Sequence, residues 1–262
     1  MPSDSNGRGR VLAAFLFLFI FLVAGGYFVT GLDKLQDRNT LRESQAALQS
    51  ITDPAQIDEA LRQNPSNKIL RLMSMAIKAT NETRAATEKL SGEIEPPSVS
   101  KAVDFGKASR GDLEALRHDL KAAEANATSF LPRYVALYKA ERDKVENDAR
   151  SLRLDKDTMG NLLAGIDKRH AKTIALTSRV LSALADYYRA YEKYVAFLVG
   201  ELGSYKVVDG QFIFPLQRTV ERYGVAANAM TAAAKRVAEL EEERKKLKPP
   251  LQEEWAQFVR AK

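Results

Sequence analysis

Three long stretches of the chain repeat an apolar or small residue at spacings that alternate between three and four. The first stretch runs from Leu113 to Leu137, the second from Ile174 to Leu202 and the third from Leu216 to Val237. This spacing places the repeated side chains on one face of an α-helix, where partner helices can pack against them. We therefore expect a mainly α protein whose soluble part is an elongated antiparallel helical bundle of about four long helices.

Shorter helices are expected before these stretches, over residues 33–100. Asp53 and Pro54 have the residue types that favour the N-cap and the first position of a helix, and Asn64-Pro65 should end that helix. A longer helix is predicted over residues 66–90. The stretch 91–100 contains two consecutive prolines and is predicted to be a linker.

A small β-hairpin is predicted near residues 205–214, inside a bundle that spans residues 101–248. Asp209-Gly210 is a typical two-residue hairpin turn, and β-branched and aromatic residues flank it on both sides. Because a lone hairpin is marginally stable in water, this one should pack on the helices. Pro215 should open the last long helix. Pro132 interrupts the first repeat without changing its register, so it should kink that helix rather than end it.

The apolar run 11–32 carries no charged residue. As a helix it would be about 33 Å long, close to the thickness of the hydrocarbon core of a membrane. We therefore expect one N-terminal transmembrane helix that anchors the protein in the lipid bilayer. Arg8 and Arg10 lie in the preceding tail 1–10, so the positive-inside rule places the N-terminus in the cytoplasm. Most of the chain would then be extracytoplasmic, which means periplasmic in a Gram-negative cell.

A cleaved signal peptide is the alternative interpretation of this run. Ala24 and Gly26 are small residues two positions apart, as a cleavage site after Gly26 would require. The apolar run continues through residues 27–32 and exceeds a usual signal-peptide core, which favours the uncleaved anchor. Both interpretations export the rest of the chain.

Charge and cysteine content exclude several classes of protein. The formal net charge is +6, but basic and acidic residues are interspersed, so no single-sign stripe is available to bind nucleic acid. The chain has no cysteine. This excludes disulfides, thiolate zinc sites and cysteine nucleophiles.

No pattern of catalytic residues stands out, and we expect no enzymatic activity, no metal and no cofactor. The chain has two histidines, His118 and His170. Neither has a glutamate three positions before it, which a di-iron bundle would require. The motifs of zinc proteases, serine hydrolases and phosphate-binding loops are also missing from the sequence. We expect His170 to be a satisfied, partly buried residue and His118 to lie at the surface.

Two groups of aromatic residues are candidates for binding. The second stretch is rich in tyrosine: Tyr188 and Tyr191 fit the repeat, and Tyr187 and Tyr194 flank it. These tyrosines either form a face that binds a ligand or partner, or fill the wide end of the bundle core. The final amphipathic segment 249–262 carries Trp255 and Phe258, which could dock on the bundle, on a partner or on the membrane surface.

These features predict a non-catalytic interaction or scaffold protein of the cell envelope. Its partner would be another envelope protein or a second copy of the chain, in addition to the lipid bilayer. The alternative is an extracytoplasmic helical bundle that senses a ligand and signals through a partner protein.

Overall fold

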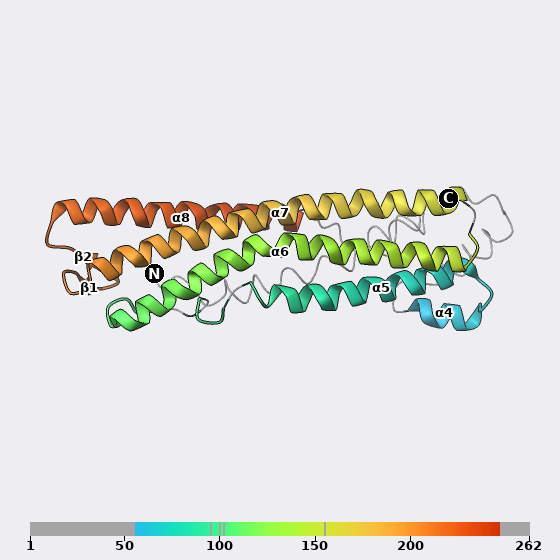
Figure 1. Cartoon of the computed structure of the whole chain (residues 1–262), viewed down its shortest axis with the longest axis horizontal. Helices are drawn as coiled ribbons and strands as arrows, with labels where there is room; N and C mark the ends of the chain where they lie inside the picture. Colours follow the sequence, from blue (N-terminus) through green and yellow to red (C-terminus); the bar gives the residue numbers. More distant parts are fainter. Residues whose placement is uncertain (1–55, 95, 100, 102, 155, 247–262) are drawn as a thin grey trace. The chain divides into compact units, whose positions relative to one another are not determined.

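The computed structural model of the chain describes residues 56–94, 96–99, 101, 103–154 and 156–246. Within these ranges the protein is mainly helical, with five helices and one two-stranded antiparallel sheet (Figure 1). Four of the five helices have between 24 and 45 residues. The mainly α class and the bundle-like arrangement are therefore confirmed.

Several predictions lie outside the described residues. These are the transmembrane anchor with Arg8 and Arg10, the Asp53 cap, and the C-terminal segment with Trp255 and Phe258. Of the helices that the structure does describe, none combines the length and the hydropathy that crossing a membrane requires.

The first two described helices are α4, Ile57–Gln63, and α5, Lys68–Ser91. Helix α4 ends directly before Asn64-Pro65, as the sequence predicts. The side chain of Asn67 then accepts a hydrogen bond of 3.1 Å from the backbone N–H of Leu70, which satisfies one of the free donors at the start of α5.

Helices α6, Arg110–Ser151, and α7, Lys156–Gly200, contain the first two apolar repeats. A reciprocal pair of hydrogen bonds starts α6: Ser109 Oγ accepts from the Asp112 N–H, and Asp112 Oδ2 accepts from the Ser109 N–H. Helix α6 continues through Pro132 without a break. The prediction that Pro132 does not end the helix is therefore confirmed.

The chain divides into two compact units, each of which combines segments that are distant in the sequence. Among the described residues, unit 1 contains 89–133 and 176–245, and unit 2 contains 56–88, 134–175 and Lys246. Helices α6 and α7 each supply one part to each unit.

Helices α5, α6 and α7 share one hydrophobic core in unit 2. Leu70 and Met73 of α5, Val145 of α6, and Leu162 and Ile166 of α7 all belong to it. Leu70 is completely buried and Met73 is 1% exposed. These side chains come from three helices, which is the packing that a repeat of three and four favours.

In unit 1, ion pairs link α6 to the antiparallel α7. Arg117 Nη2 lies 2.8 Å from Glu192 Oε1, and Arg189 Nη2 lies 2.8 Å from Glu124 Oε1. Leu120 of α6 and Leu198 of α7 are fully buried in this unit. The first two apolar repeats are therefore core-forming here.

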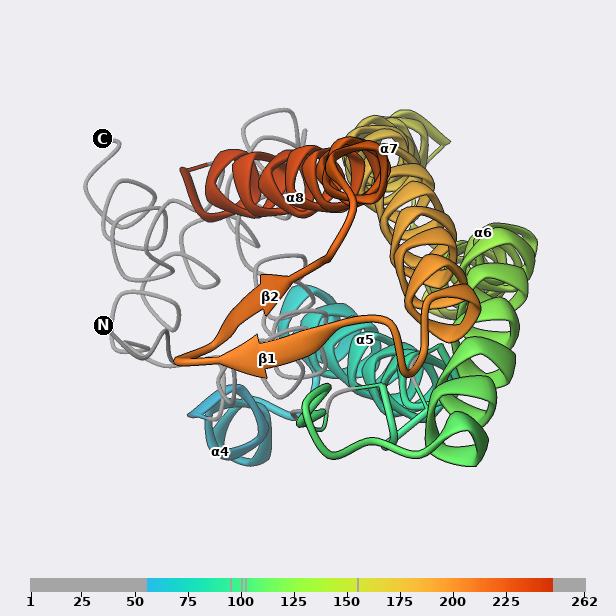
Figure 2. The same cartoon turned by 90° about the vertical axis from the view of Figure 1, so that its left-hand side faces the viewer.

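The predicted hairpin is present. Strands β1, Lys206–Val208, and β2, Gln211–Ile213, pair in antiparallel register through the turn Asp209-Gly210 (Figure 2). Both turn residues have positive φ, 51° for Asp209 and 77° for Gly210. A two-residue turn with this backbone matches the twist of the two strands that it joins.

Helix α8, Gln217–Lys246, contains most of the third repeat but is less buried than the other two. Val237 and Leu240, in its second half, are buried, whereas Val220 near its start is 41% exposed. The start of this helix therefore presents apolar side chains to solvent.

Candidate functional site

Seven aromatic side chains of unit 1 gather where the hairpin meets α7 and α8, and we call them the aromatic cluster. They are Phe105, Tyr194, Phe197, Tyr205, Phe212, Phe214 and Tyr223. Such ring pairs contribute about 0.5–1.5 kcal/mol each beyond the area that they bury. The cluster therefore fixes the hairpin onto the helices, as a marginally stable two-stranded sheet requires.

Phe212 is the central ring of the aromatic cluster. Its centroid lies 5.2 Å from that of Tyr223 and 5.3 Å from that of Tyr205. Strand alternation explains its position, because Phe212 and its cross-strand partner Val207 point to the same face of the hairpin. On that face, a methyl group added at Gly106 would lie 3.2 Å from Val207 Cβ, so Gly106 allows the close approach of the strand.

Tyr194 joins α7 to this cluster and is 5% exposed. Its ring lies edge-on to Phe212, and its hydroxyl lies 3.5 Å from that of Tyr223. Burial raises the pKa of Tyr194 well above its ordinary value, and the hydrogen bond to Tyr223 adds a smaller increase in the same direction. Tyr194 is therefore a neutral core residue.

The four predicted tyrosines of α7 separate into two pairs. Tyr188 is 1% exposed and, like Tyr194, lies in the core. Tyr187 and Tyr191 are half-buried, with ring centroids 5.9 Å apart, and we call them the tyrosine face. The Tyr191 ring continues to Tyr194 at 6.4 Å, so the tyrosine face is connected to the aromatic cluster. Burial raises the pKa of Tyr191 to about 12.

A buried polar group lies in unit 2, between α5, α6 and α7. Glu141 is 4% exposed, and its Oε1 atom accepts a hydrogen bond of 3.0 Å from Thr80 Oγ1. His170 Nε2 lies 3.9 Å from the same oxygen, too far for a direct hydrogen bond. Glu141 Oε2 and His170 Nε2 are both buried without a hydrogen-bond partner among the described residues.

Two tyrosines complete this polar group. The ring of Tyr138 meets His170 edge-on at 4.6 Å, and its hydroxyl accepts a hydrogen bond from Tyr134. Burial raises the pKa of Tyr138 well above its ordinary value. His170 is buried, but Nε2 is unpaired, so the prediction of a satisfied histidine is wrong in that respect. His118, with a side chain 85% exposed, lies at the surface as predicted.

A sequence signal for Glu141 existed. Glu141 follows Tyr134 and Leu137 on the continuation of the first repeat, where an apolar residue is expected, and a carboxylate there indicates a buried polar contact. The described residues contain no group of three His, Cys, Asp or Glu side chains placed to hold a metal ion.

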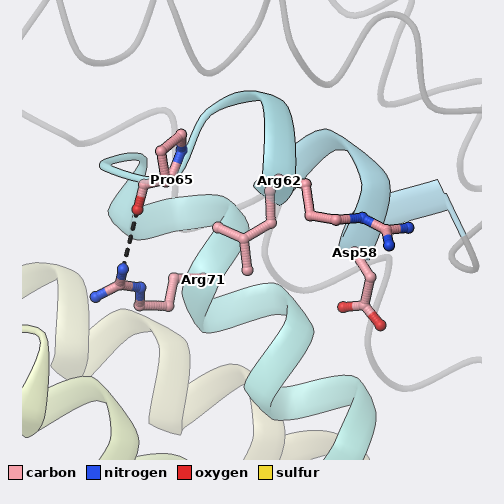
Figure 3. Close-up of a pocket in the computed structure, with 5 residues that line it drawn as sticks. Asp58, Arg62, Pro65 and Arg71 are labelled. Carbon is pink, nitrogen blue, oxygen red and sulfur yellow. Dashed lines mark hydrogen bonds between the residues drawn. The ribbon is translucent and has the colours of Figure 1, made fainter.

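A shallow depression of about 510 Å³ lies between α4 and the start of α5 (Figure 3). Asp58, Arg62 and Arg71 line it, together with Leu61 and Pro65. Its polar groups already have partners: Asp58 accepts from Ser74 Oγ at 2.6 Å, and Arg71 Nη2 donates to the Pro65 carbonyl at 3.0 Å. The depression therefore offers a ligand few uncommitted polar contacts.

Comparison with known proteins gives no relationship that would identify the site. No family model, curated protein or solved structure matches the chain. The functional argument therefore depends on the residues themselves, and the tyrosine face with the aromatic cluster behind it is the site that they favour.

Proposed function

We propose that the protein is a non-catalytic interaction protein of the cell envelope, and that a partner protein docks on the tyrosine face. The single observation that carries this proposal is the half-buried pair Tyr187 and Tyr191, which is continuous with the buried aromatic cluster. Tyrosine is enriched in protein interfaces and among the residues that contribute most binding energy.

The aromatic side chains that pack against Tyr191 favour tight docking of a partner. Tyr191 contacts the buried Tyr194, which packs in turn against Phe212 and Tyr223. Side chains that are already held in place lose less conformational entropy when a partner binds. A rigid aromatic surface of this kind gives contact area at low entropic cost.

The proposal includes a membrane tether. The uncharged run 11–32 would anchor an elongated antiparallel bundle in the membrane, with its N-terminus in the cytoplasm. Fractionation of cells followed by N-terminal sequencing of the mature protein tests this part. Recovery of the intact N-terminus in the membrane fraction is expected, whereas a soluble protein that starts after Gly26 would contradict the anchor.

The docking proposal is tested with the full-length protein purified from its own membranes. We expect a specific partner to co-purify with the unmodified protein and its yield to fall at least tenfold for the double variant Tyr187→Ser/Tyr191→Ser. The control is Val225→Ser, which changes an apolar residue that is 73% exposed elsewhere in unit 1. Circular dichroism melting of all three proteins shows that the fold is retained. Equal yields from the double variant and the control would contradict the proposal.

A further inference from the structure

The buried polar group of unit 2 holds two polar atoms that the helices around it do not satisfy. Glu141 comes from α6 and His170 from α7, and their side chains are 2% and 8% exposed. Glu141 Oε2 and His170 Nε2 have no hydrogen-bond partner among the described residues. Folded proteins pair nearly all buried polar atoms, because an unpaired one lowers stability. Two such atoms from facing helices therefore indicate that the site takes up a further group.

The space around these two atoms selects the smallest ligand, a proton. Neither Glu141 Oε2 nor His170 Nε2 is accessible to water. His170 Nε2 lies 3.9 Å from Glu141 Oε1, which is too long for a direct hydrogen bond but close enough for opposite charges to attract. A proton needs no cavity, and a protonated imidazole presents both ring nitrogens as donors.

The carboxylate of Glu141 is the acceptor that such a proton would face. Its Oε1 atom accepts a hydrogen bond of 3.0 Å from Thr80 Oγ1, which holds the side chain in place and leaves Oε2 for a second donor. Imidazole is a stronger base than a carboxylate, so the proton belongs on His170. A buried carboxylate without a cation is unfavourable, and an imidazolium on the facing helix would compensate its charge.

The other ionisable groups of α6 and α7 that face this pair are two tyrosines and an arginine. Tyr138 meets the His170 ring edge-on at 4.6 Å, and burial keeps the pKa of Tyr138 well above its ordinary value, so it stays neutral. Tyr134 donates its hydroxyl hydrogen to Tyr138. Arg169 acts electrostatically on the Tyr138 hydroxyl and keeps its charge at every pH considered below.

Helix α5 faces the pair with the uncharged hydroxyl of Thr80. Arg84, one turn further along α5, lies 3.7 Å from Glu88 on the same helix. Glu82 forms an ion pair with Lys144 of α6 at the surface, where both side chains are at least 40% exposed. Among the groups facing the carboxylate, His170 is therefore the one whose charge changes near neutral pH.

We propose that Glu141 and His170 form a proton-binding site, which closes into an imidazolium–carboxylate pair when the pH falls. The proton would give both buried atoms a hydrogen bond and join α6 to α7 inside unit 2. Imidazoles change charge between about pH 5 and 8, so the pair forms within that range. This inference goes beyond the proposed function and depends neither on the tyrosine face nor on the membrane anchor.

Nitrogen NMR of the full-length protein tests the site directly, because the chain has only two histidines. The protein is labelled at its histidine nitrogens and studied in detergent micelles, and His118→Gln assigns the two rings. At about pH 5 we expect both ring nitrogens of His170 to carry protons, and at about pH 8 only one. The Nε2–H of His170 should exchange with water at least about tenfold more slowly than the ring N–H groups of His118, whose side chain is 85% exposed.

Removal of one carboxylate at a time from α6 provides the matched comparison. Glu141→Gln keeps the size of the side chain and an oxygen that can accept from Thr80, but it removes the charge. His170 should then hold only one ring proton at about pH 5, because the buried imidazolium has lost its counter-charge. The control is Asp143→Asn, which removes a carboxylate that is 52% exposed and should leave the His170 signals unchanged. Circular dichroism melting shows whether each variant keeps the fold.

Two results would overturn the proposal. The first is a His170 ring with the same number of protons at about pH 5 and about pH 8 in the unmodified protein. This result needs no variant, so the proposal stays testable even if Glu141→Gln fails to fold. The second is a second ring proton that remains on His170 in a folded Glu141→Gln variant, which would show that the carboxylate does not hold it.

Discussion

Glu141 and His170 place two ionisable side chains in the interior of unit 2 with one polar atom each left without a hydrogen bond. Burying a polar group without a partner costs about 1–3 kcal/mol, and more when the group is charged. Glu141 keeps one hydrogen bond, from Thr80, and the nearest nitrogen of His170 lies 3.9 Å from the oxygen that accepts it.

A double-mutant cycle tests whether the two side chains interact. We expect His170→Leu to lower the free energy of unfolding by about 1–3 kcal/mol, because it puts an apolar side chain beside the buried Glu141, whose Oε2 atom already lacks a hydrogen bond. Glu141→Leu should also lower the free energy of unfolding. The loss in the double variant should be smaller than the sum of the two single losses by at least about 1 kcal/mol. Urea denaturation gives all three values, with the exposed His118→Leu as a control of small effect. Additive losses would show that the two side chains do not interact.

Tyr191 makes stability depend on alkaline pH. Burial raises its pKa to about 12, whereas a tyrosine in an unfolded chain titrates near pH 10. Below about pH 10 both states hold the proton and the stabilisation is complete; between about pH 10 and 12 only the folded state holds it, so stability falls as pH rises. Tyr191→Phe should reduce that slope by up to about 1.4 kcal/mol per pH unit in urea titrations. An unchanged slope would show that Tyr191 ionises freely in the folded protein.

At the scale of elements, the glycines of the long helices and the glycine of the hairpin have opposite roles. Gly160 in α7 and Gly224 in α8 have helical backbone, and a methyl group added at either would meet nothing within 4 Å. Gly210 has a φ of 77°, in the left-handed region that the hairpin turn requires.

These glycines predict opposite effects of the same substitution. Gly160→Ala and Gly224→Ala should each raise the free energy of unfolding by about 0.5–1 kcal/mol, because alanine loses less backbone entropy than glycine in a helix. Gly210→Ala should lower it by about 1 kcal/mol, since alanine is strained at positive φ. Thermal melts followed by circular dichroism measure all three. A loss of stability at Gly224 would indicate that another molecule contacts α8 at that position.

At the scale of the whole molecule, two separate sets of buried residues support the two units. Leu70 belongs to the core of unit 2, and Leu120 is fully buried in unit 1. Replacing either leucine with alanine should lower the free energy of unfolding by about 2–5 kcal/mol, because apolar burial is lost and a cavity remains.

Hydrogen exchange can locate each loss. We expect Leu70→Ala to accelerate amide exchange in α4 and α5 more than in α8, because the cavity opens in the core that α5 shares. Leu120→Ala should give the reverse order. Mass spectrometry of exchanged peptides measures both patterns in one experiment. Equal acceleration in both units by each variant would mean that the protein opens as a single cooperative body.

Much of the helical architecture could be predicted from local sequence. The apolar repeats identified α6, α7 and α8, and Asn64-Pro65 and Asp209-Gly210 marked the end of α4 and the hairpin turn. These features succeed because helical period, proline geometry and positive-φ turns depend on a few neighbouring residues. The burial of individual residues was less predictable: Leu137 fits the first repeat, but Tyr138 occupies the core.

The candidate site could be predicted only in part. The sequence indicates that α7 is rich in tyrosine, but the division into a core pair, Tyr188 and Tyr194, and a half-buried pair depends on which faces of α7 meet other helices. Phe105 and Gly106 carried no local signal, because their contacts come from a strand about a hundred residues later in the chain. The same holds for Val220, whose place on the third repeat predicts burial although it is exposed.

By itself, the sequence determined the helices, their approximate ends, the hairpin and the side of each helix that is apolar. Only the tertiary structure decided which apolar sides are covered, which tyrosines remain accessible, and that Glu141 and His170 face each other. The physical reason is that periodicity is a local property of the chain, whereas burial depends on contacts between residues far apart in it.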